Sequence, residues 1–219
     1  GYLNKKRSFL QWGVKAQHEE IGDRLSEWNM IDSAGFALPK TTDSVGYTVP
    51  SMQPSQSLEI LDVLKTEISV KSNRLMGYIQ NNWNWKSPDS TEYTFNAGMR
   101  LNYWDLNNQL LWSPRASFSL DPNWKKDVIF RAALGVYHQP PFYRELRDLN
   151  GVIHSDLKAQ QSIHLVLGSD YHFKAWNRPF KLVSELYYKN LKHLIPYEID
   201  NVRIRYYANN NAVGYAAGV

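Results

Sequence analysis

Few residues of this chain have the types and spacing that catalysis or metal binding requires. His18, Glu19 and Glu20 could be imagined as metal ligands, but such a cluster is also typical of a charged strand end or loop. The other histidines are dispersed, without the HExxH spacing that puts two imidazoles on one helix face. His164 and His172 fall on one face of an expected strand, about 26 Å apart at ~3.3 Å per residue, so they cannot share one ion. We expect no metal, no cofactor and no enzymatic activity.

Neither the carboxylates nor the charge balance indicates an enzyme or a nucleic-acid-binding protein. Three carboxylates, those of Asp121, Asp127 and Glu92, lie at or near expected strand ends. At such places a carboxylate is more often a solvated part of a turn than a catalytic group. The sequence contains no glycine-rich phosphate loop and no GxSxG motif. Its 25 basic and 21 acidic residues are scattered, and the net charge is only +4, so nucleic acid is not an expected partner.

The composition is typical of a protein with many half-exposed aromatic side chains. Hydrophobic residues make up 43% of the 219 residues, with 14 Tyr and 8 Trp against 8 Phe, and there is no Cys. Tyr and Trp combine an apolar body with a polar tip, which suits membrane interfaces, sugar-binding faces and protein interfaces. No run of about 18 apolar residues occurs, which excludes a transmembrane helix, but a transmembrane strand needs only about 9–11 residues with one apolar face.

The elements that would position these side chains are long strands. Between Thr91 and Tyr103 apolar residues occupy every second position, and since strand side chains alternate between faces, this segment has one apolar and one polar face. Pro114 predicts a local defect in the next strand, because proline removes a ladder donor. Helical periodicity is found only at 58–64. Further strands are expected at 10–16, 110–120, 128–136, 163–173 and 180–188, with weaker candidates at 74–85 and 212–219.

The connections between these segments alternate in length. Short polar turns are expected at 86–90, 122–126 and 175–178. Long loops are expected near 20–70, 138–160 and 190–211, and a short link at 104–108 breaks the rule. Short turns at one end and long loops at the other are typical of outer-membrane barrels. We therefore predict an all-β protein, an antiparallel up-and-down meander of about eight long strands, in which residues 1–219 form a single segment of a transmembrane β-barrel.

Several motifs resemble the barrel region of TonB-dependent outer-membrane receptors of the Bacteroidetes type. Leu134 to Leu146 (LGVYHQPPFYREL) is similar to that family's strand and following outer loop. Trp112 to Phe118 resembles a strand that descends into the barrel, and Leu157 to Tyr171 lies where the family has LKxExSxxxxLGxxY. Glu185–Lys189, Asn201–Arg203 and Asn209–Gly214 together resemble the motif at the C-terminal end of the family's barrel, YYK…N…GxAxGxE. The resemblance is best over 91–219. Gln160 departs from it, because the family has Glu there.

The resemblance implies a fold, a location and partners. It implies a portion of a barrel of about 22 strands in the Gram-negative outer membrane, in contact with lipid and lipopolysaccharide. It implies a small-molecule or oligomeric nutrient as ligand, such as a siderophore, cobalamin, glycan or peptide. It also implies the receptor's own plug domain and periplasmic TonB as partners, through regions that are not found in these 219 residues.

Two sets of candidate site residues follow from the strands and loops. Polar-face charges are expected to line the barrel lumen, where they pair with a plug or guide a solute. A second set lies close together at the start of a long loop, where we expect contact with the ligand. Pro140 and Pro141 in this loop could simply make it rigid. The lumen set is Arg100, Arg115, Arg131, Lys181 and Glu185, and the ligand set is Tyr137, His138, Phe142, Tyr143 and Arg144.

Aromatic residues near the strand ends are expected to form interface girdles. This set is Trp83, Trp85, Tyr103, Trp104, Trp124, Tyr187 and Tyr188. Two other functions remain open. In a soluble β-sandwich the aromatic residues would stack on a carbohydrate, and the charged polar faces would be the solvated side of an ordinary sheet. In a small complete outer-membrane barrel the chain would act as an anchor or adhesin.

Overall fold

The computed structural model describes residues 1–5, 7–31, 59–200 and 203–219. These residues form strands almost throughout, and the helical structure given for them is one 3₁₀ turn, η2 (Tyr143–Leu146). None of the helical structure in these ranges is long and apolar enough to cross a bilayer. The strands are β1 (Tyr2–Lys5), β2 (Ser8–Ile31), β3 (Glu59–Lys86), β4 (Glu92–Trp104), β5 (Gln109–Asp121), β6 (Asp127–Gln139), β7 (Gln160–Ala175), β8 (Arg178–Leu194), β9 (Tyr197–Asp200), β10 (Arg203–Tyr206) and β11 (Ala212–Gly218).

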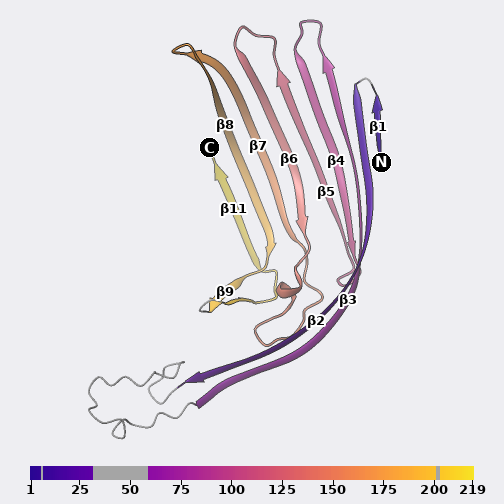
Figure 1. The fold of residues 1–219 in the computed structure, drawn as a ribbon, viewed down its shortest axis with the longest axis vertical. Helices are drawn as coiled ribbons and strands as arrows, with labels where there is room; N and C mark the ends of the chain where they lie inside the picture. Colours follow the sequence, from indigo (N-terminus) through magenta and orange to yellow (C-terminus); the bar gives the residue numbers. More distant parts are fainter. Residues whose placement is uncertain (6, 32–58, 201–202) are drawn as a thin grey trace, which may run out of the picture. The chain divides into compact units, whose positions relative to one another are not determined.

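The strands form an antiparallel meander in which β1 to β8 pair in sequence order and β11 pairs with β8. One nine-stranded sheet has the order β1-β2-β3-β4-β5-β6-β7-β8-β11, and β9 and β10 form a separate two-stranded sheet (Figure 1). The eight strands β2 to β8 and β11 confirm the predicted all-β meander. Because the order starts at β1 and ends at β11, the sheet is open within the described ranges, as expected for part of a barrel wall.

Contacts divide the chain into two compact units. Residues 1–19 and 71–219 form the larger unit, which holds most of the sheet, and residues 20–70 form the smaller one. In the smaller unit, the C-terminal part of β2 pairs with the N-terminal part of β3. The Arg24–Glu67 ion pair of 3.0 Å and Lys65 over the Trp28 ring, 5.8 Å from its centroid, join these two segments.

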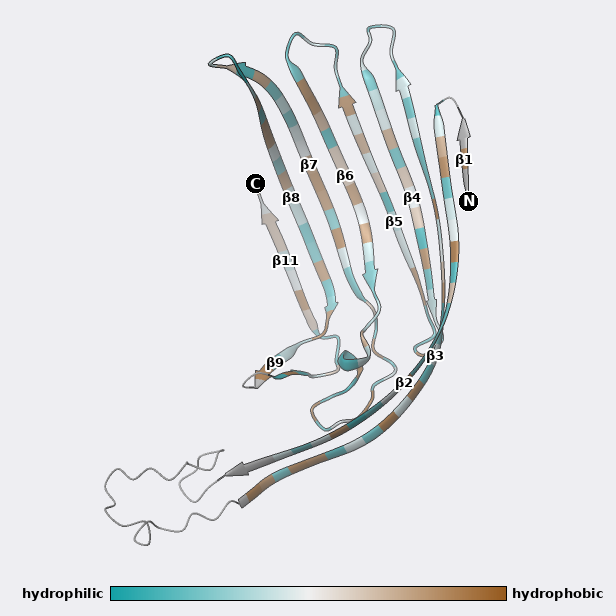
Figure 2. Ribbon diagram, viewed as in Figure 1, coloured by the Kyte–Doolittle hydropathy of each residue, from teal (hydrophilic) through white to brown (hydrophobic). Residues whose placement is uncertain are grey.

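The alternating residues form strands as predicted, and the strands are long. β4, β5 and β6 have 13 residues each, and β7 and β8 have 16 and 17. Figure 2 shows the alternation as bands of opposite hydropathy along β4 to β8. The β4–β5 register is uninterrupted from Glu92↔Asp121 to Trp104↔Gln109. The β5–β6 pairing runs only from Arg115↔Gly135 to Leu120↔Phe130, so it stops beside Pro114, which has no N–H to donate.

Two expectations need correction. The long connection predicted near 20–70 is strand at both of its ends, because β2 continues to Ile31 and β3 begins at Glu59. Residues 32–58 lie outside the described residues. The helical spacing at 58–64 is also misleading, since residues 59–64 belong to β3. Ile60, Leu61 and Val63 are exposed on both faces of that strand, and apolar residues on both faces can imitate a helical period.

Short and long connections lie at opposite ends of the strands of the larger unit. The turns 87–91, 122–126 and 176–177 join β3–β4, β5–β6 and β7–β8. Both residues of the last turn have positive φ, +47° at Trp176 and +58° at Asn177, the conformation of a tight type I′ hairpin. The opposite end carries the short link 105–108 and the connections 140–159 and 195–211, the last of which contains β9 and β10.

These connections share the small hydrophobic core of the larger unit. Trp104, Leu146, Leu157, Ile195 and Ala208 are at most 7% exposed and pack together. Hydrogen bonds reinforce the packing: the Asn107 side-chain amide donates to the Leu157 carbonyl at 3.0 Å. The Lys158 N–H donates to Asn210 Oδ1 at 2.7 Å. The connections at this end therefore form one ordered layer.

Candidate functional site

The strand register collects most of the large apolar side chains of the larger unit on one face of the sheet, here called the apolar face. A single row across it reads Trp83, Phe95, Phe118, Ala132, Leu167 and Leu186. These side chains are not covered: Trp83 is 38% exposed, Leu167 46% and Leu186 52%. Large exposed apolar areas are unusual on a soluble monomer and mark contact with a protein or a membrane.

Aromatic side chains gather on the apolar face close to the short turns. Trp85 stacks on Tyr93 with ring centroids 5.4 Å apart, and Trp124 lies edge-on to Phe130 at 5.8 Å. Tyr103 lies at the other end of β4, ten positions from Tyr93, which is about 33 Å along a strand and about 25 Å in height if the strand is tilted by about 40°. That height equals the apolar band of an outer-membrane barrel.

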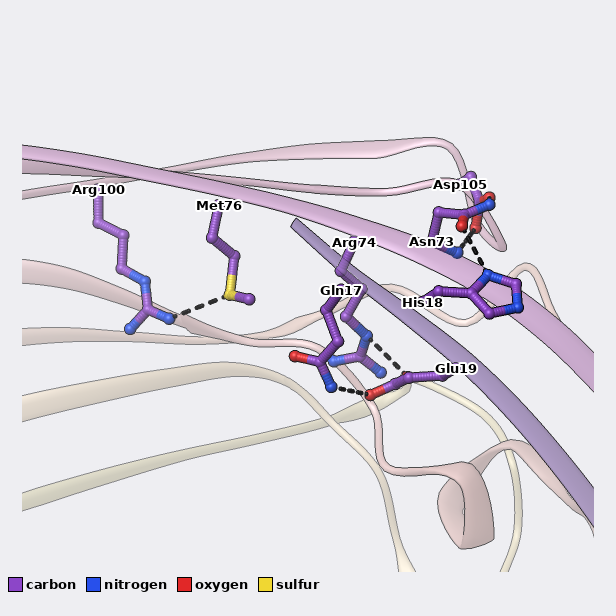
Figure 3. A network of polar contacts seen from close by, with 8 residues as sticks. All are labelled: Gln17, His18, Glu19, Asn73, Arg74, Met76, Arg100 and Asp105. Carbon is purple, nitrogen blue, oxygen red and sulfur yellow. Dashed lines mark hydrogen bonds and ion pairs between the residues drawn. The ribbon is translucent and has the colours of Figure 1, made fainter. Parts of the chain in front are cut away.

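Trp104 does not belong to a girdle, contrary to the prediction. It is 3% exposed, and the Arg74 guanidinium lies over its ring, 4.0 Å from the centroid. Arg74 also forms an ion pair with Glu19, whose carboxylate oxygen is 3.3 Å from Nε (Figure 3). Trp104 pairs with Arg74 across β4 and β3. Because Trp104 is one position after Tyr103, its side chain points to the side of the sheet opposite the apolar face.

Figure 3 shows further contacts of this network, made by residues of β2, β3 and β4. Gln17 donates to Glu19 at 2.7 Å, and Arg100 Nη2 lies 3.5 Å from Met76 Sδ. On the opposite face, His18 Nδ1 is 2.8 Å from Asn73 Oδ1. His18, Glu19 and Glu20, which could have been imagined as metal ligands, do not form one site, because Glu19 and His18 contact different partners on opposite faces.

Asp105 anchors the short link that follows β4. It accepts hydrogen bonds from the backbone N–H of Asn73 at 2.8 Å and from the Asn73 side-chain amide at 2.7 Å. The backbone and then the side-chain bond hold the pKa of Asp105 below its ordinary value, because both stabilise the ionised form. The carboxylate thereby ties the link to β3.

The five predicted lumen residues all lie on one face, here called the polar face, since each has the parity opposite to the apolar rows. That this face lines a lumen stays a prediction. Arg131 and Lys181 meet at Asp170, whose side chain is 7% exposed; Lys181 Nζ is 2.9 Å from Oδ2, and Arg131 binds Oδ1. Arg115 Nη2 donates to Gln80 Oε1 at 2.7 Å. The sequence prediction omitted Asp170, although its even position in β7 puts it on the polar face.

The predicted ligand residues near the long loop do not share one environment. The rings of Tyr137 and His164 are tilted against each other on the polar face, with centroids 4.7 Å apart. His138 is half-buried, with Ser113 Oγ 3.2 Å from Nδ1 and Gln161 Nε2 2.9 Å from Nε2. Phe142 is 62% exposed at the start of η2, which contains Tyr143 and Arg144. Ligand contact by these residues stays a prediction.

The loop after β6 is held by carboxylates that the sequence prediction did not select. Glu145 is buried and accepts from the Phe142 N–H at 2.8 Å and from the Gln160 side-chain amide at 3.4 Å. At 160 a glutamine can donate to Glu145, whereas the glutamate of the resembled motif would place two carboxylates side by side.

Asp148 organises the second half of the same loop. Its carboxylate accepts from the N–H groups of Asn150 and Val152, both at 2.9 Å, and lies 2.9 Å from His154 Nε2. Partial burial raises the pKa of Asp148, but the hydrogen bonds from His154 and the two N–H groups together outweigh it and hold the pKa below the ordinary value.

Two hollows lie in the larger unit, neither of them expected from the sequence. A cavity of about 340 Å³ among the loop connections is bordered by His154, Asp156, Lys158 and His193. A cavity of about 270 Å³ on the polar face is bordered by Gln11, Gln80, Asn96, Arg115 and Tyr137. No group of three His, Asp or Glu side chains within the described ranges is arranged to hold a metal ion.

Comparison with known proteins gives one result. The family model described as TonB dependent receptor-like, beta-barrel matches residues 3–219. No curated protein and no solved structure matches the chain. The matched range covers both the motifs that carry the resemblance and the more weakly patterned residues 3–90.

Proposed function

The chain belongs to the TonB-dependent receptor β-barrel family, and from that premise we propose that it is a barrel-wall portion of a receptor that imports a scarce nutrient. The family consists of transporters of the outer membrane rather than enzymes, and its members act with TonB and a ligand. The observation that carries the proposal is the apolar face, whose large side chains stay exposed across the strands of the larger unit.

The exposure of this face favours a membrane over a soluble sandwich. A sandwich covers its apolar face with a second sheet about 10 Å away. The second sheet of the described residues, β9 and β10, has only four residues per strand. Lipid hydrocarbon satisfies apolar side chains directly, while the paired strands satisfy the backbone N–H and C=O groups.

The limits of the lipid-facing surface can be inferred from β2 and β3. On β2 the apolar-face positions are Trp12, Val14 and Ala16, and the same parity then carries Glu20 and Arg24. On β3 the corresponding change comes between Leu75 and Lys71. Charged side chains are costly in hydrocarbon. We infer that lipid contact ends near Ala16 and Leu75.

The asymmetry of the connections supports an orientation. Outer-membrane barrels have short periplasmic turns and long extracellular loops. The turns 87–91, 122–126 and 176–177 would then face the periplasm, and the loop layer would face the outside. Lipopolysaccharide would contact the outer end of the apolar face. The receptor's plug and the solute would contact the polar face. An incoming ligand would first reach the predicted loop residues Phe142, Tyr143 and Arg144.

The test uses the full-length receptor expressed in a Gram-negative host. We expect it in the outer-membrane fraction, extracted only by detergent, with faster gel migration before heating than after it. Deleting its gene should abolish growth on a limiting nutrient that cells with the gene take up in a TonB-dependent way. Recovery in the aqueous fraction without detergent would favour the sandwich, and normal uptake of every tested nutrient without the gene would contradict the transport role.

A further inference from the structure

The hollow on the polar face is bordered mainly by uncharged amides and a hydroxyl, with Arg115 as a charged side chain of its wall. Its walls include Gln11, Gln80, Asn82, Asn96 and Ser117, here called the amide patch, which come from four adjacent strands, β2 to β5. The volume of about 270 Å³ lies just below the ~300–1,000 Å³ of pockets that enclose drug-sized ligands. The hollow can therefore hold one small unit of a solute.

Small residues between these long side chains create the space. Gly98 lies so close to β3 that an added Cβ would be 2.6 Å from the Cβ of Gln80. Ala133 of β6 borders the hollow on the other side. A larger residue at either position would fill the hollow or push the patch apart.

Hydrogen bonds hold the amide patch in place. Arg115 donates to Gln80 Oε1 at 2.7 Å, and Gln80 Nε2 donates to Gln11 Oε1 at 2.5 Å. Asn82 donates to Asn96, and Asn96 Nδ2 donates to Ser117 Oγ at 3.3 Å. Each side-chain amide has two N–H donors and an oxygen with two lone pairs, so every amide keeps donors or acceptors beyond these bonds.

This chemistry matches hydroxyl groups better than charged or apolar groups. A hydroxyl both donates and accepts, as the patch does. A carboxylate only accepts, so it could bind Arg115 and the amide N–H groups but would leave the second lone pairs of the amide oxygens unused. An apolar solute would leave donors and acceptors unpaired, which is costly. The Tyr137 ring, 42% exposed at the border of the hollow, offers an apolar surface for the C–H groups of a ring-shaped solute.

We propose that this hollow is a wall contact site for a neutral polyhydroxylated solute, such as one unit of a saccharide. The inference rests on the proposed transport function and adds the chemical class of the solute. The charged group around Asp170, bound by Arg131 and Lys181, lies on β6 to β8 and is already satisfied by its own ion pairs.

The experiment measures binding to the purified full-length receptor in detergent by titration calorimetry. The probes are three neutral oligosaccharides (maltohexaose, cellohexaose and xylohexaose) and the charged hexagalacturonate. Ala133→Phe fills the hollow, and Ala132→Phe is the matched control, since it adds the same ring on the apolar face of the same strand. We expect the wild type and A132F to bind a neutral probe and A133F to bind it at least about tenfold more weakly.

A second variant covers the possibility that A133F fails to assemble. Asn96→Leu removes an amide of the patch at similar volume and should weaken binding in the same way, while heat-modifiable migration verifies folding of every variant. Absence of neutral binding, or binding of hexagalacturonate alone, would overturn the inferred solute class. Unchanged binding in folded A133F and N96L would overturn the location. Migration and outer-membrane recovery test the transport proposal separately, because they do not depend on the probe.

Discussion

At the scale of single residues, Asp170 is the charged group with the most consequence on the polar face. Its side chain is 7% exposed, whereas those of Arg131 and Lys181 are about half exposed, at 50% and 49%. The two cations come from β6 and β8, on either side of β7, and the carboxylate between them offsets their mutual repulsion.

Asp170→Asn keeps the size of the side chain and removes its charge. We expect a lower urea midpoint for unfolding of the receptor in lipid vesicles, because both cations lose their counter-charge. The matched control is Glu185→Gln, an exposed carboxylate of the same face on β8, which should leave the midpoint within error. Equal midpoints for D170N and wild type would show that water compensates both cations.

At the scale of elements, β2 and β3 change the polarity of their faces along their length. The even positions of β2 are apolar at Trp12 and Val14, but in the smaller unit they hold Glu20, Arg24 and Ser26. The opposite parity carries half-buried apolar residues there (Ile21, Leu25, Leu64, Ile68 and Val70), together with Asp23 and Glu27 on β2. The expected strand ended at residue 16 in the sequence because charged residues lie on both parities of β2 beyond it.

Cysteine scanning can locate this change of polarity, because the chain has no native Cys. Val14→Cys and Ser26→Cys have the same parity on β2, so they form a matched pair. In the full-length receptor on intact cells, a membrane-impermeant maleimide should label S26C and spare V14C, and a fluorophore on V14C should be quenched by brominated lipid. Quenching at both positions would place residue 26 in the bilayer and contradict the inferred limit.

At the scale of the whole molecule, the larger unit is a sheet with one apolar and one polar face, which the proposed function assigns to lipid and to water. Such a surface is stable only where hydrocarbon covers the apolar side chains, so insertion and folding depend on each other. Leu165 of the apolar face and Val166 of the polar face are adjacent on β7 and test this assignment with the same substitution.

Leu165→Lys should reduce outer-membrane assembly, since a lysine on the lipid side near mid-bilayer costs about 2–4 kcal/mol. Val166→Lys should assemble nearly as well as wild type, because its ammonium would face water. Outer-membrane yield and heat-modifiable migration measure both. Equal assembly of the two variants, or a larger loss for V166K, would contradict the assignment of the faces.

The sequence by itself determined the strands of the larger unit and their two faces. Alternation from Thr91 to Tyr103 is a local property, because successive side chains of a strand point to opposite sides whatever its neighbours are. The turns also depend on a few consecutive residues, which is why 86–90, 122–126 and 175–178 were located within a residue or two.

The tertiary structure decided which residues meet across strands. Asp170 between Arg131 and Lys181, Arg74 over Trp104, and the amide patch all join residues that are far apart in sequence. The register sets these meetings, and a shift of one residue would turn each side chain to the other face. Strand periodicity therefore predicted on which face a side chain lies, but only the paired sheet determined its partner.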